Sequence, residues 1–396
     1  MGSPMSNLVK TLILLKDYRD APRMWKVMLE YYKTHAPGLV EEPPAVTITQ
    51  VEALATPECL VEIDTLSVLS KDESGWEMKK YPMLLGDVKR IYPNVEPGEP
   101  FLSEAVSIGN LIYLSGMNGE NPDLGKIETN MFEEQWNAAL EKVSATLDRA
   151  GSSMSNIIKT LHFQCRLKSL LKPSDDINRS HSPASDRLWK TELEYFDRHA
   201  PHLLDEFPGS TFLKVSSLAN PEALGQTEVI GVFDRVRPGW EVKNYPTYIG
   251  QRGFPRHVGD IKKYYSNTVR VGNLLYISGQ TATDIYTARI ESSVFEDQML
   301  TALKNLRAAL EEAGGSLENL VKTYILLPNP EATTRMRQIL LEFYQKYAPR
   351  LVEEPPASAV IHPHNLASPT MLIEIDAVAF IPDNLASVPN ESTSGI

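Results

Sequence analysis

A short pattern occurs three times in this chain of 396 residues, and this internal repeat limits the fold more than any other feature. Each copy reads as a polar residue, Asn, two apolar residues, Lys, Thr and an apolar or aromatic residue, at 6–12, 155–161 and 318–324. A second pattern, His-Ala-Pro or Tyr-Ala-Pro, follows each copy and ends at Pro37, Pro201 and Pro349. The spacing between the two patterns is 15 residues longer in the middle copy, which therefore carries an insertion. We place the insertion within 166–187, because Ser, Asp, Asn, Arg and Pro dominate that stretch, as they do in loops.

A longer pattern occurs only twice and predicts a β-hairpin. Residues 106–116 match residues 269–279, and in both Gly-Asn separates two β-rich runs that end in Ser-Gly. The first copy of the repeat has no such hairpin and no helix after it, so the chain holds two whole modules and the C-terminal half of another. A half module leaves a strand edge and an apolar face uncovered. We expect it either to dock on the other modules or to reflect a sequence that begins within a module, and the uncovered edge also favours a homodimer.

The spacing of apolar residues predicts the order of elements within a module. Apolar residues from Phe295 to Leu310 share one helical face, and this pattern stops at Gly314-Gly315. Further patterns predict a second helix and three strands, at 331–347, 320–327, 357–361 and 371–380. The order is β-β-α-β-α-β-β, an α+β fold with two helices on one face of a sheet. The chain is then organised as a partial module (1–70), a linker (71–100), a complete module (101–235), a second linker (236–264), a second complete module (265–382) and a flexible tail (383–396).

Composition excludes several classes of function. The net charge of −12 argues against a nucleic-acid or anionic-membrane binder, whose affinity comes from clustered Lys and Arg. No apolar run reaches the roughly 18 residues of a membrane-spanning helix, and the N-terminus shows no signal-peptide core. Two cysteines, Cys59 and Cys165, form neither a disulfide framework nor a cysteine-rich zinc site. His362-Pro363-His364 invites a metal site, but with no third ligand at a recognisable spacing a surface loop is favoured. We expect a cytoplasmic protein that holds no metal.

These motifs resemble the Rid (YjgF/YER057c/UK114) superfamily. The resemblance lies in Tyr265-Ser266-Asn267, in 271–280, in 306–327 and in 373–377, and it is fullest in the last module. It implies a chorismate-mutase-like fold and, with three modules on one chain, an intramolecular pseudo-trimer whose active sites lie between modules. It also implies a cofactor-free hydrolase that releases ammonia from an enamine or imine of a carboxylic acid, such as 2-aminoacrylate or 2-aminomuconate.

The resemblance also implies site residues. The glutamate that holds the attacking water in the family falls on Glu374, with Glu62 and Gln226 at the equivalent positions of the other modules. An acid follows two residues later, on the same face of the strand, at Asp376 and its counterparts Asp64 and Glu228. The remaining pocket residues that the resemblance implies are Tyr265, Ser278, Gln280 and, in the second module, Ser115.

The arginine that pairs with the substrate carboxylate in the family is absent from its usual position. An ungapped match places Thr47, Thr211 and Ala359 there. We expect a replacement cation, and Arg350 and Arg270 are the nearest candidates in the motif regions. Four further arginines precede the last module, at Arg235, Arg237, Arg252 and Arg256.

Two interpretations stay open. Glu374 alternates with apolar neighbours, which is also typical of a half-buried strand with a solvated acidic face. The chain is then either a hydrolytic deaminase or a degenerate tandem protein that binds a small acidic metabolite, or a protein partner, without turnover.

Overall fold

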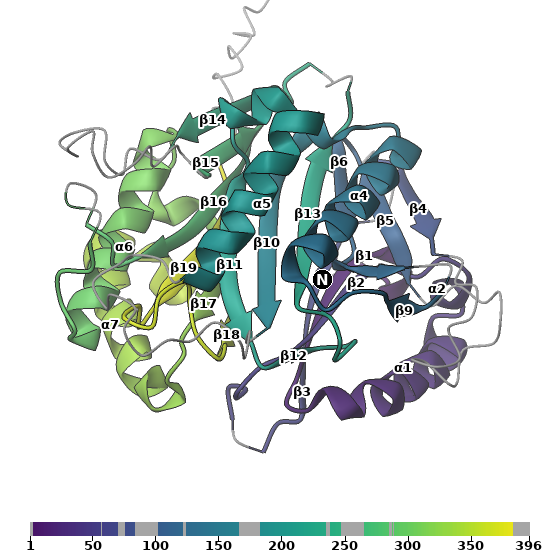
Figure 1. Ribbon diagram of the computed structural model, residues 1–396. Coiled ribbons are helices and arrows are strands. Elements are labelled where there is room, and N and C mark those ends of the chain that lie inside the picture. The colour runs from purple at the N-terminus through teal and green to yellow at the C-terminus, as the bar shows by residue number, and fades with distance from the viewer. Residues whose placement is uncertain are drawn as a thin grey trace, which may run out of the picture.

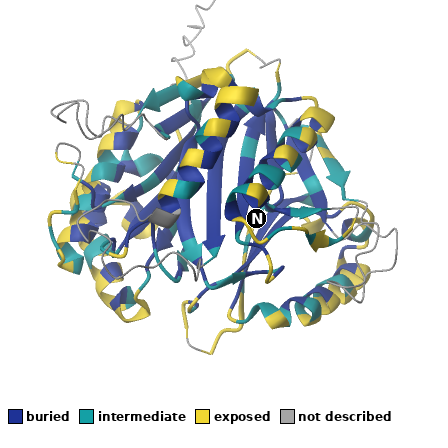
Figure 2. Cartoon of the chain, in the orientation of Figure 1, coloured by how far each residue is buried: buried dark blue, intermediate teal, exposed yellow. Residues whose placement is uncertain are grey.

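The computed structural model describes residues 3–56, 58–69, 76–83, 102–121, 124–165, 183–234, 238–246, 265–284, 287 and 289–382 (Figure 1). We call residues 3–69 the first module, 102–234 the second and 265–382 the third. Strands of all three modules are hydrogen-bonded into one sheet of 17 strands. The long helices cover this sheet from outside, and their outer turns are exposed while the strands beneath them are buried (Figure 2).

The third module runs through its elements in the predicted order. They are β15 (Ser266–Val271), β16 (Leu274–Thr281), α6 (Phe295–Glu312), β17 (Leu320–Leu326), α7 (Thr333–Tyr347), α8 (Arg350–Glu353), β18 (Ala357–Ile361) and β19 (Glu374–Phe380). The hairpin turns at Gly272, whose positive φ of 57° suits the Gly-Asn sequence. The last strand begins at Glu374 and not at Met371, as the apolar pattern suggested. β19 lies between β16 and β17, antiparallel to both.

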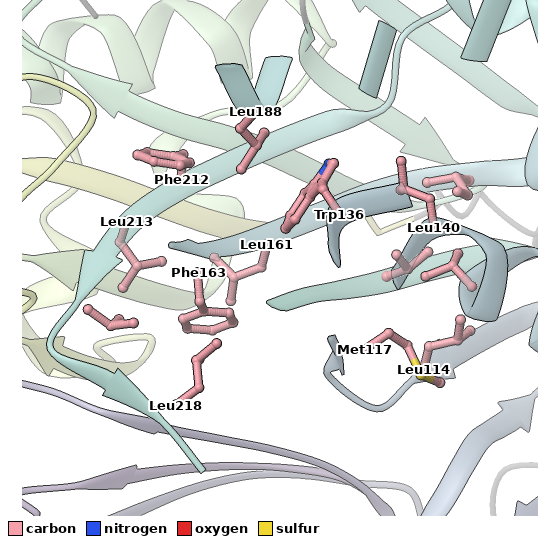
Figure 3. Close-up of a cluster of buried hydrophobic side chains, with 14 of the residues drawn as sticks. Leu114, Met117, Trp136, Leu140, Leu161, Phe163, Leu188, Phe212, Leu213 and Leu218 are labelled. Carbon is pink, nitrogen blue, oxygen red and sulfur yellow. The ribbon is translucent and has the colours of Figure 1, made fainter. Parts of the chain in front are cut away.

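The second module has the same plan with small additions. Its main elements are β5 (Ser103–Ile108), β6 (Leu111–Leu114), β7 (Met117–Asn118), α4 (Phe132–Ala150), β10 (Ile157–Cys165), α5 (Pro183–His199), β11 (Gly209–Val215), β12 (Ser217–Leu218) and β13 (Gly225–Val232). A short ribbon of β8 (Glu120–Asn121) and β9 (Lys126–Ile127) precedes α4. Apolar side chains from the helices and strands pack into one core around Trp136, Leu161 and Phe163 (Figure 3).

The first module consists only of the second half of this plan. It has β1 (Leu8–Leu15), α1 (Ala21–His35), α2 (Gly38–Glu41), β2 (Ala45–Gln50) and β3 (Val61–Ser67), with β1 between the other two strands. It docks on the second module, where β2 pairs with β5 and with β12. Docking on the other modules was one of the two alternatives that the half module left open.

Segments that we expected as linkers also contribute strands. β4 (Met78–Pro82) lies within 71–100 and runs antiparallel to β5, and β14 (Val242–Pro246) lies within 236–264 and runs antiparallel to β15. Each therefore extends the hairpin that follows it. The insertion assigned to 166–187 is shorter at its C-terminal end, because α5 begins at Pro183. Its residues 166–182 and the tail 383–396 lie outside the described residues.

No described helix combines the length and the apolar character that crossing a bilayer would require.

Candidate active site

Neighbouring modules meet in two equivalent joints. One parallel bridge links β2 to β5 at Ala45 and Ser103, and another links β11 to β15 at Gly209 and Ser266. In each joint the hairpin of one module continues the sheet of the module before it. The two hairpins also touch each other, with the hydroxyls of Tyr113 and Tyr276 3.3 Å apart.

A lysine and an acid from neighbouring modules form an ion pair at each of the three module contacts. Lys10 binds Glu228, Lys159 binds Asp376 and Lys322 binds Asp64. These are the lysines of the repeated sequence pattern and the acids two residues beyond Glu62, Gln226 and Glu374. The first two pairs are buried, and the side chains of the third are 20% and 18% exposed. The pairs form a cycle: the lysine of the first module binds the acid of the second, that of the second binds the acid of the third, and that of the third binds the acid of the first.

Glu374 lies at the contact of the second and third modules. It opens β19, opposite Thr281 of β16 and Leu326 of β17, and only 5% of the residue is exposed. Gly279 lies directly against it, so that a methyl group at position 279 would overlap the Glu374 carboxyl group. A side chain at position 279 would therefore force the carboxyl group of Glu374 out of this position.

Burial is the main cause of an unusual acidity at Glu374. Burial, together with the neighbouring charge of Asp376, raises the pKa of the carboxyl group to about 8. Lys159 and a hydrogen bond from the backbone N–H of Phe212 act in the opposite direction. A carboxyl group of this pKa is largely protonated at neutral pH and can serve as a general acid.

One aromatic ring lies near this carboxyl group and contacts a second ring from another module. Tyr265 stands just ahead of β15, and burial together with the charge of Glu374 raises the pKa of its phenol to about 12. Its ring centroid lies 6.4 Å from that of Trp189 on α5. A groove of about 230 Å³ reaches Tyr265 and is lined by Phe207 and Asn244 among others, whereas Glu374 lines neither this groove nor a cavity of about 620 Å³ beside α7.

Ser278 holds modules together, which corrects its expected place in the lining of the pocket. Its hydroxyl accepts the backbone N–H of Ser210, at 2.8 Å, and donates to the carbonyl of Ser266. Ser115 makes the same two bonds in the other joint, to the N–H of Val46 and the carbonyl of Ser103. Each hydroxyl thus gives its proton to a backbone carbonyl of its own module and accepts a backbone N–H of the module before it.

Asp376 and the nearest cation bind each other. Lys159 reaches Asp376 at 2.5 Å and donates to Thr211 and to the carbonyl of Ile277, and the hydroxyl of Thr211 donates to Asp376. Thr211 occupies the position expected of the missing arginine. Lys159 was not among the predicted site residues, although the recurrence of this lysine in all three copies of the pattern was a signal.

The equivalents of Glu374 occupy different surroundings. Gln226 is buried and donates to the carbonyl of Gly116 at 3.1 Å. Glu62 lies on β3, where every residue is at least partly exposed, and burial together with Asp64 raises the pKa of its carboxyl group. Glu62 is thus not part of an enclosed cleft.

Neither candidate replacement arginine reaches Glu374. Arg350 lies on the surface, where it pairs with Glu318. Arg270 donates to the carbonyl of Gly272 in the hairpin turn. Arg270 pairs with Leu275, which in turn pairs with Ala379 of β19. Ala379 is five residues, or roughly 17 Å, along β19 from Glu374. Arg235, Arg237, Arg252 and Arg256 lie outside the described residues.

Two further expectations concern polar side chains near the joints. Gln280 is buried and donates to Asn267 and to the carbonyl of Ser278, so it supports the hairpin. His362 was expected in a surface loop, but it is 1% exposed and contacts the carbonyl of Leu327 through Nδ1. His364 contacts Glu52 of the first module. The described residues contain no group of three His, Cys, Asp or Glu side chains that could hold a metal.

Comparison with known families gives one match. The family model described as Endoribonuclease L-PSP matches residues 94–183 and 260–381, which together make up more than half of the chain.

Individual relatives cover single modules. A RutC family protein of Pyrococcus horikoshii is 31% identical over 116 residues, which are 29% of this chain and 86% of the relative. A 2-iminobutanoate/2-iminopropanoate deaminase of Mus musculus is 32% identical over 85 residues, which are 22% of this chain and 63% of that protein. A solved chorismatase structure resembles the chain over its length, with a TM-score of 0.55 and 11% identity over 96% of both chains. At that identity the likeness concerns the fold alone.

Proposed function

Because this chain belongs to the endoribonuclease L-PSP family, the Rid superfamily, we propose that it hydrolyses an imine or enamine of a carboxylic acid at the contact of the second and third modules, beside Glu374, and releases ammonia. The observation that carries this proposal is the buried carboxyl group of Glu374, whose pKa is raised to about 8. Kinship with proteins named as 2-iminobutanoate/2-iminopropanoate deaminases supports the reaction class. The module cycle closed by the three lysine–acid pairs supports a further proposal, that the three modules form a pseudo-trimer.

The reaction needs one group that both gives and takes a proton. Protonated Glu374 donates its proton to the terminal carbon of the enamine, which becomes an iminium. The resulting carboxylate takes a proton from water as the water oxygen attacks the imine carbon, and a carbinolamine forms. Glu374 then protonates the amine, the C–N bond breaks, and the hydroxyl proton returns to Glu374 as the ketone forms. A pKa near the working pH suits such a group, because both of its protonation states are accessible.

The surroundings of Glu374 favour a planar, conjugated acid over the smallest imines. Lys159 is paired with Asp376, and neither candidate arginine within the described residues, Arg350 or Arg270, is placed to hold a short carboxylate in two bonds beside Glu374. Tyr265 supplies aromatic surface near Glu374, and Trp189 extends that surface on the other side of Tyr265. We therefore propose a 2-aminomuconate-like substrate ahead of 2-aminoacrylate.

Ammonia release from freshly generated 2-aminomuconate, 2-aminoacrylate and 2-iminobutanoate tests this proposal. Glu374→Gln preserves the size of the side chain and removes the acid, so we expect release to fall to background. The matched control is Glu353→Gln, on the exposed end of α8, which should release ammonia at the unmodified rate.

A second candidate function is the binding of a small acid without turnover. It is favoured by the replacement of the arginine by Thr211, whose hydroxyl is bound to Asp376. Binding of a conjugated dicarboxylate, weakened by Glu374→Gln and with no ammonia released from any of the three imines, would replace the enzymatic proposal by this one.

A further inference from the structure

The cavity of about 620 Å³ beside α7 is lined entirely by described residues. Its wall consists of Phe295 at the start of α6, residues 328–332, which lead into α7, Arg335 on α7 and part of the loop 364–372. The volume lies within the range of about 300–1,000 Å³ that is typical of small-molecule sites. Glu374 follows this loop by two residues but does not line the cavity, so the cavity is separate from the site beside Glu374.

One part of the wall is apolar. Phe295, Met371 and Leu372 contribute to it, together with three prolines. The guanidinium carbon of Arg335 lies 6.0 Å from the centre of the Phe295 ring, so that a cation and an aromatic ring share one surface. Such a surface suits a ligand with a planar, apolar body.

The polar part of the wall offers hydrogen-bond donors. Arg335 pairs with Glu296 through one terminal nitrogen, and a guanidinium carries five N–H groups. The side-chain oxygens of Asn329 and Asn365 each accept a backbone N–H close in sequence, which leaves the NH2 groups of both amides for an acceptor. Glu331 is the one acid of the lining, and it is exposed. A ligand in this space therefore needs acceptor oxygens beside a cation, which a carboxylate supplies.

His364 is held at the edge of the cavity by the other two modules. Its Nδ1 lies 2.8 Å from Oε1 of Glu52 in the first module, and the hydroxyl of Ser216 in the second module donates to the same oxygen at 2.6 Å. Partial burial of Glu52 opposes its ionisation, but these two bonds outweigh it and lower the pKa of the carboxyl group. Because a carboxylate only accepts, His364 keeps a proton on Nδ1, and Nε2 is its ring nitrogen for a ligand.

These three residues are equivalent in the three modules. The repeated lysine pairs with the first residue of β2, β11 or β18, and each of the three residues lies seven positions further on: Glu52 after Ala45, Ser216 after Gly209 and His364 after Ala357. Equivalent positions that bond to one another show that all three modules meet here. A ligand against His364 is then bound where the modules come together.

We propose that the cavity beside α7 is a binding site for a small carboxylic acid with a planar, apolar body. Arg335 supplies the cation for the carboxylate, and the amide of Asn329 or Asn365 adds a donor. The body of the ligand lies against Phe295 and Met371. This site is independent of the reaction proposed at Glu374.

Calorimetric titration of the full chain with 2-naphthoate tests the proposal. We expect one saturable site per chain, with a Kd on the order of 1 mM for a ligand of this size. The probe 2-naphthamide has the same planar body without the charge and should bind at least ten-fold more weakly.

Substitutions in the wall identify the cavity as the site. Arg335→Gln should weaken binding of 2-naphthoate at least ten-fold. The matched control is Arg337→Gln, which removes the same charge from an exposed position of α7 that does not line the cavity, and it should leave binding unchanged. Leu372→Trp fills the cavity without changing a charge and should abolish binding, so the test does not depend on the pair of Arg335 with Glu296.

A site-specific signal completes the experiment. Carbon-13 labelling of methionine methyl groups, with Met371→Leu to assign the signal, should show a shift of the Met371 methyl group when the naphthalene ring binds. Glu374→Gln should leave this shift and the Kd unchanged. Absence of binding, or equal binding to the unmodified chain, Arg335→Gln and Leu372→Trp, would overturn the proposal. Binding that is lost in Glu374→Gln but retained in Leu372→Trp would place the acid at the second joint and would overturn it as well.

Discussion

The joint of the first and second modules and the joint of the second and third modules share one scaffold but differ in the side chain that can do chemistry. Each has a single parallel bridge and a buried lysine–acid pair. Each also has a serine, Ser115 or Ser278, whose hydroxyl binds the backbone of both modules, and we call these serines the serine clamps. At the equivalent position one joint has Gln226 and the other Glu374. An amide cannot ionise, whereas burial of a carboxyl group gives a proton donor near neutral pH. The two joints therefore have the same structural framework, and the glutamate at position 374 adds the capacity for proton transfer to one of them.

The contact of the third and first modules shows what the hairpin contributes. It retains the ion pair of Lys322 and Asp64, but no hairpin within the described ranges pairs with β3, on which Glu62 is half-exposed. An exposed carboxyl group does not acquire the strongly raised pKa of Glu374. Enclosure by a hairpin is therefore as necessary to the site as the glutamate.

The largest expected effect separates the two joints by activity. Glu374→Gln should lower ammonia release at least about 100-fold, the usual contribution of a general acid, whereas Gln226→Met should change it less than about two-fold. Steady-state ammonia release from the best imine substrate measures both. Equal losses of ammonia release in the two variants would mean that both joints are needed for activity, which would contradict the difference drawn between them.

The buried ion pairs should dominate stability. Lys159→Met and Lys10→Met each leave a buried carboxylate without its partner, at a cost of about 3–5 kcal/mol in the free energy of unfolding. Lys322→Met should cost less, about 1 kcal/mol, because its pair with Asp64 is partly exposed. Denaturant unfolding of the three variants gives the ranking, and equal costs would show that the third contact is as enclosed as the others.

The acidity of Glu374 predicts a pH dependence of stability that Gln226 cannot produce. The pKa of Glu374 is about 8 in the folded chain, against about 4.5 for the ordinary carboxyl group, so the folded state holds one more proton between these values. The stabilisation is complete below pH 4.5 and is lost as the pH rises through 8, at roughly 1.4 kcal/mol per pH unit. Unfolding of the unmodified chain and of Glu374→Gln, compared between pH 5 and pH 8, measures the difference. A difference that stays constant over this range would contradict a buried, protonated Glu374.

The serine clamps should give effects that are similar to each other and smaller than those of the two buried ion pairs. Ser278→Ala and Ser115→Ala each leave a buried backbone N–H without its acceptor, at a cost of about 1–3 kcal/mol in the free energy of unfolding. Similar losses in the two variants, measured by denaturant unfolding, would sharpen the equivalence of the joints. If Ser278→Ala instead abolished ammonia release with unchanged stability, its hydroxyl would belong to the reaction and not to the joint.

Local patterns predicted the elements of the modules well because their causes are local. Gly-Asn sets the hairpin turn at Gly272, and the glycines after Leu310 end α6. The strands in the expected linkers escaped detection, because β4 and β14 are specified by pairing with the hairpins that follow and not by their own apolar pattern.

The site could be predicted only as far as residues of one module determine it. Glu374 and Tyr265 came from the resemblance and do lie near each other, as their electrostatic interaction indicates. The role of Ser278 depends on Ser210, which belongs to another module and is 68 residues away in sequence. Arg350 and Arg270 lie near the motifs in sequence, but strand direction and surface partners place them elsewhere.

The protonation state of Glu374 tests the central claim most directly. Carbon-13 labelling of the glutamate side chains, with Glu374→Gln to assign the signal, allows its carboxyl carbon to be titrated by NMR. The structure predicts an apparent pKa near 8 and a protonated carboxyl group at pH 7. A signal that titrates near 4.5 would show a solvated carboxylate and would contradict the proposed chemistry of the second joint.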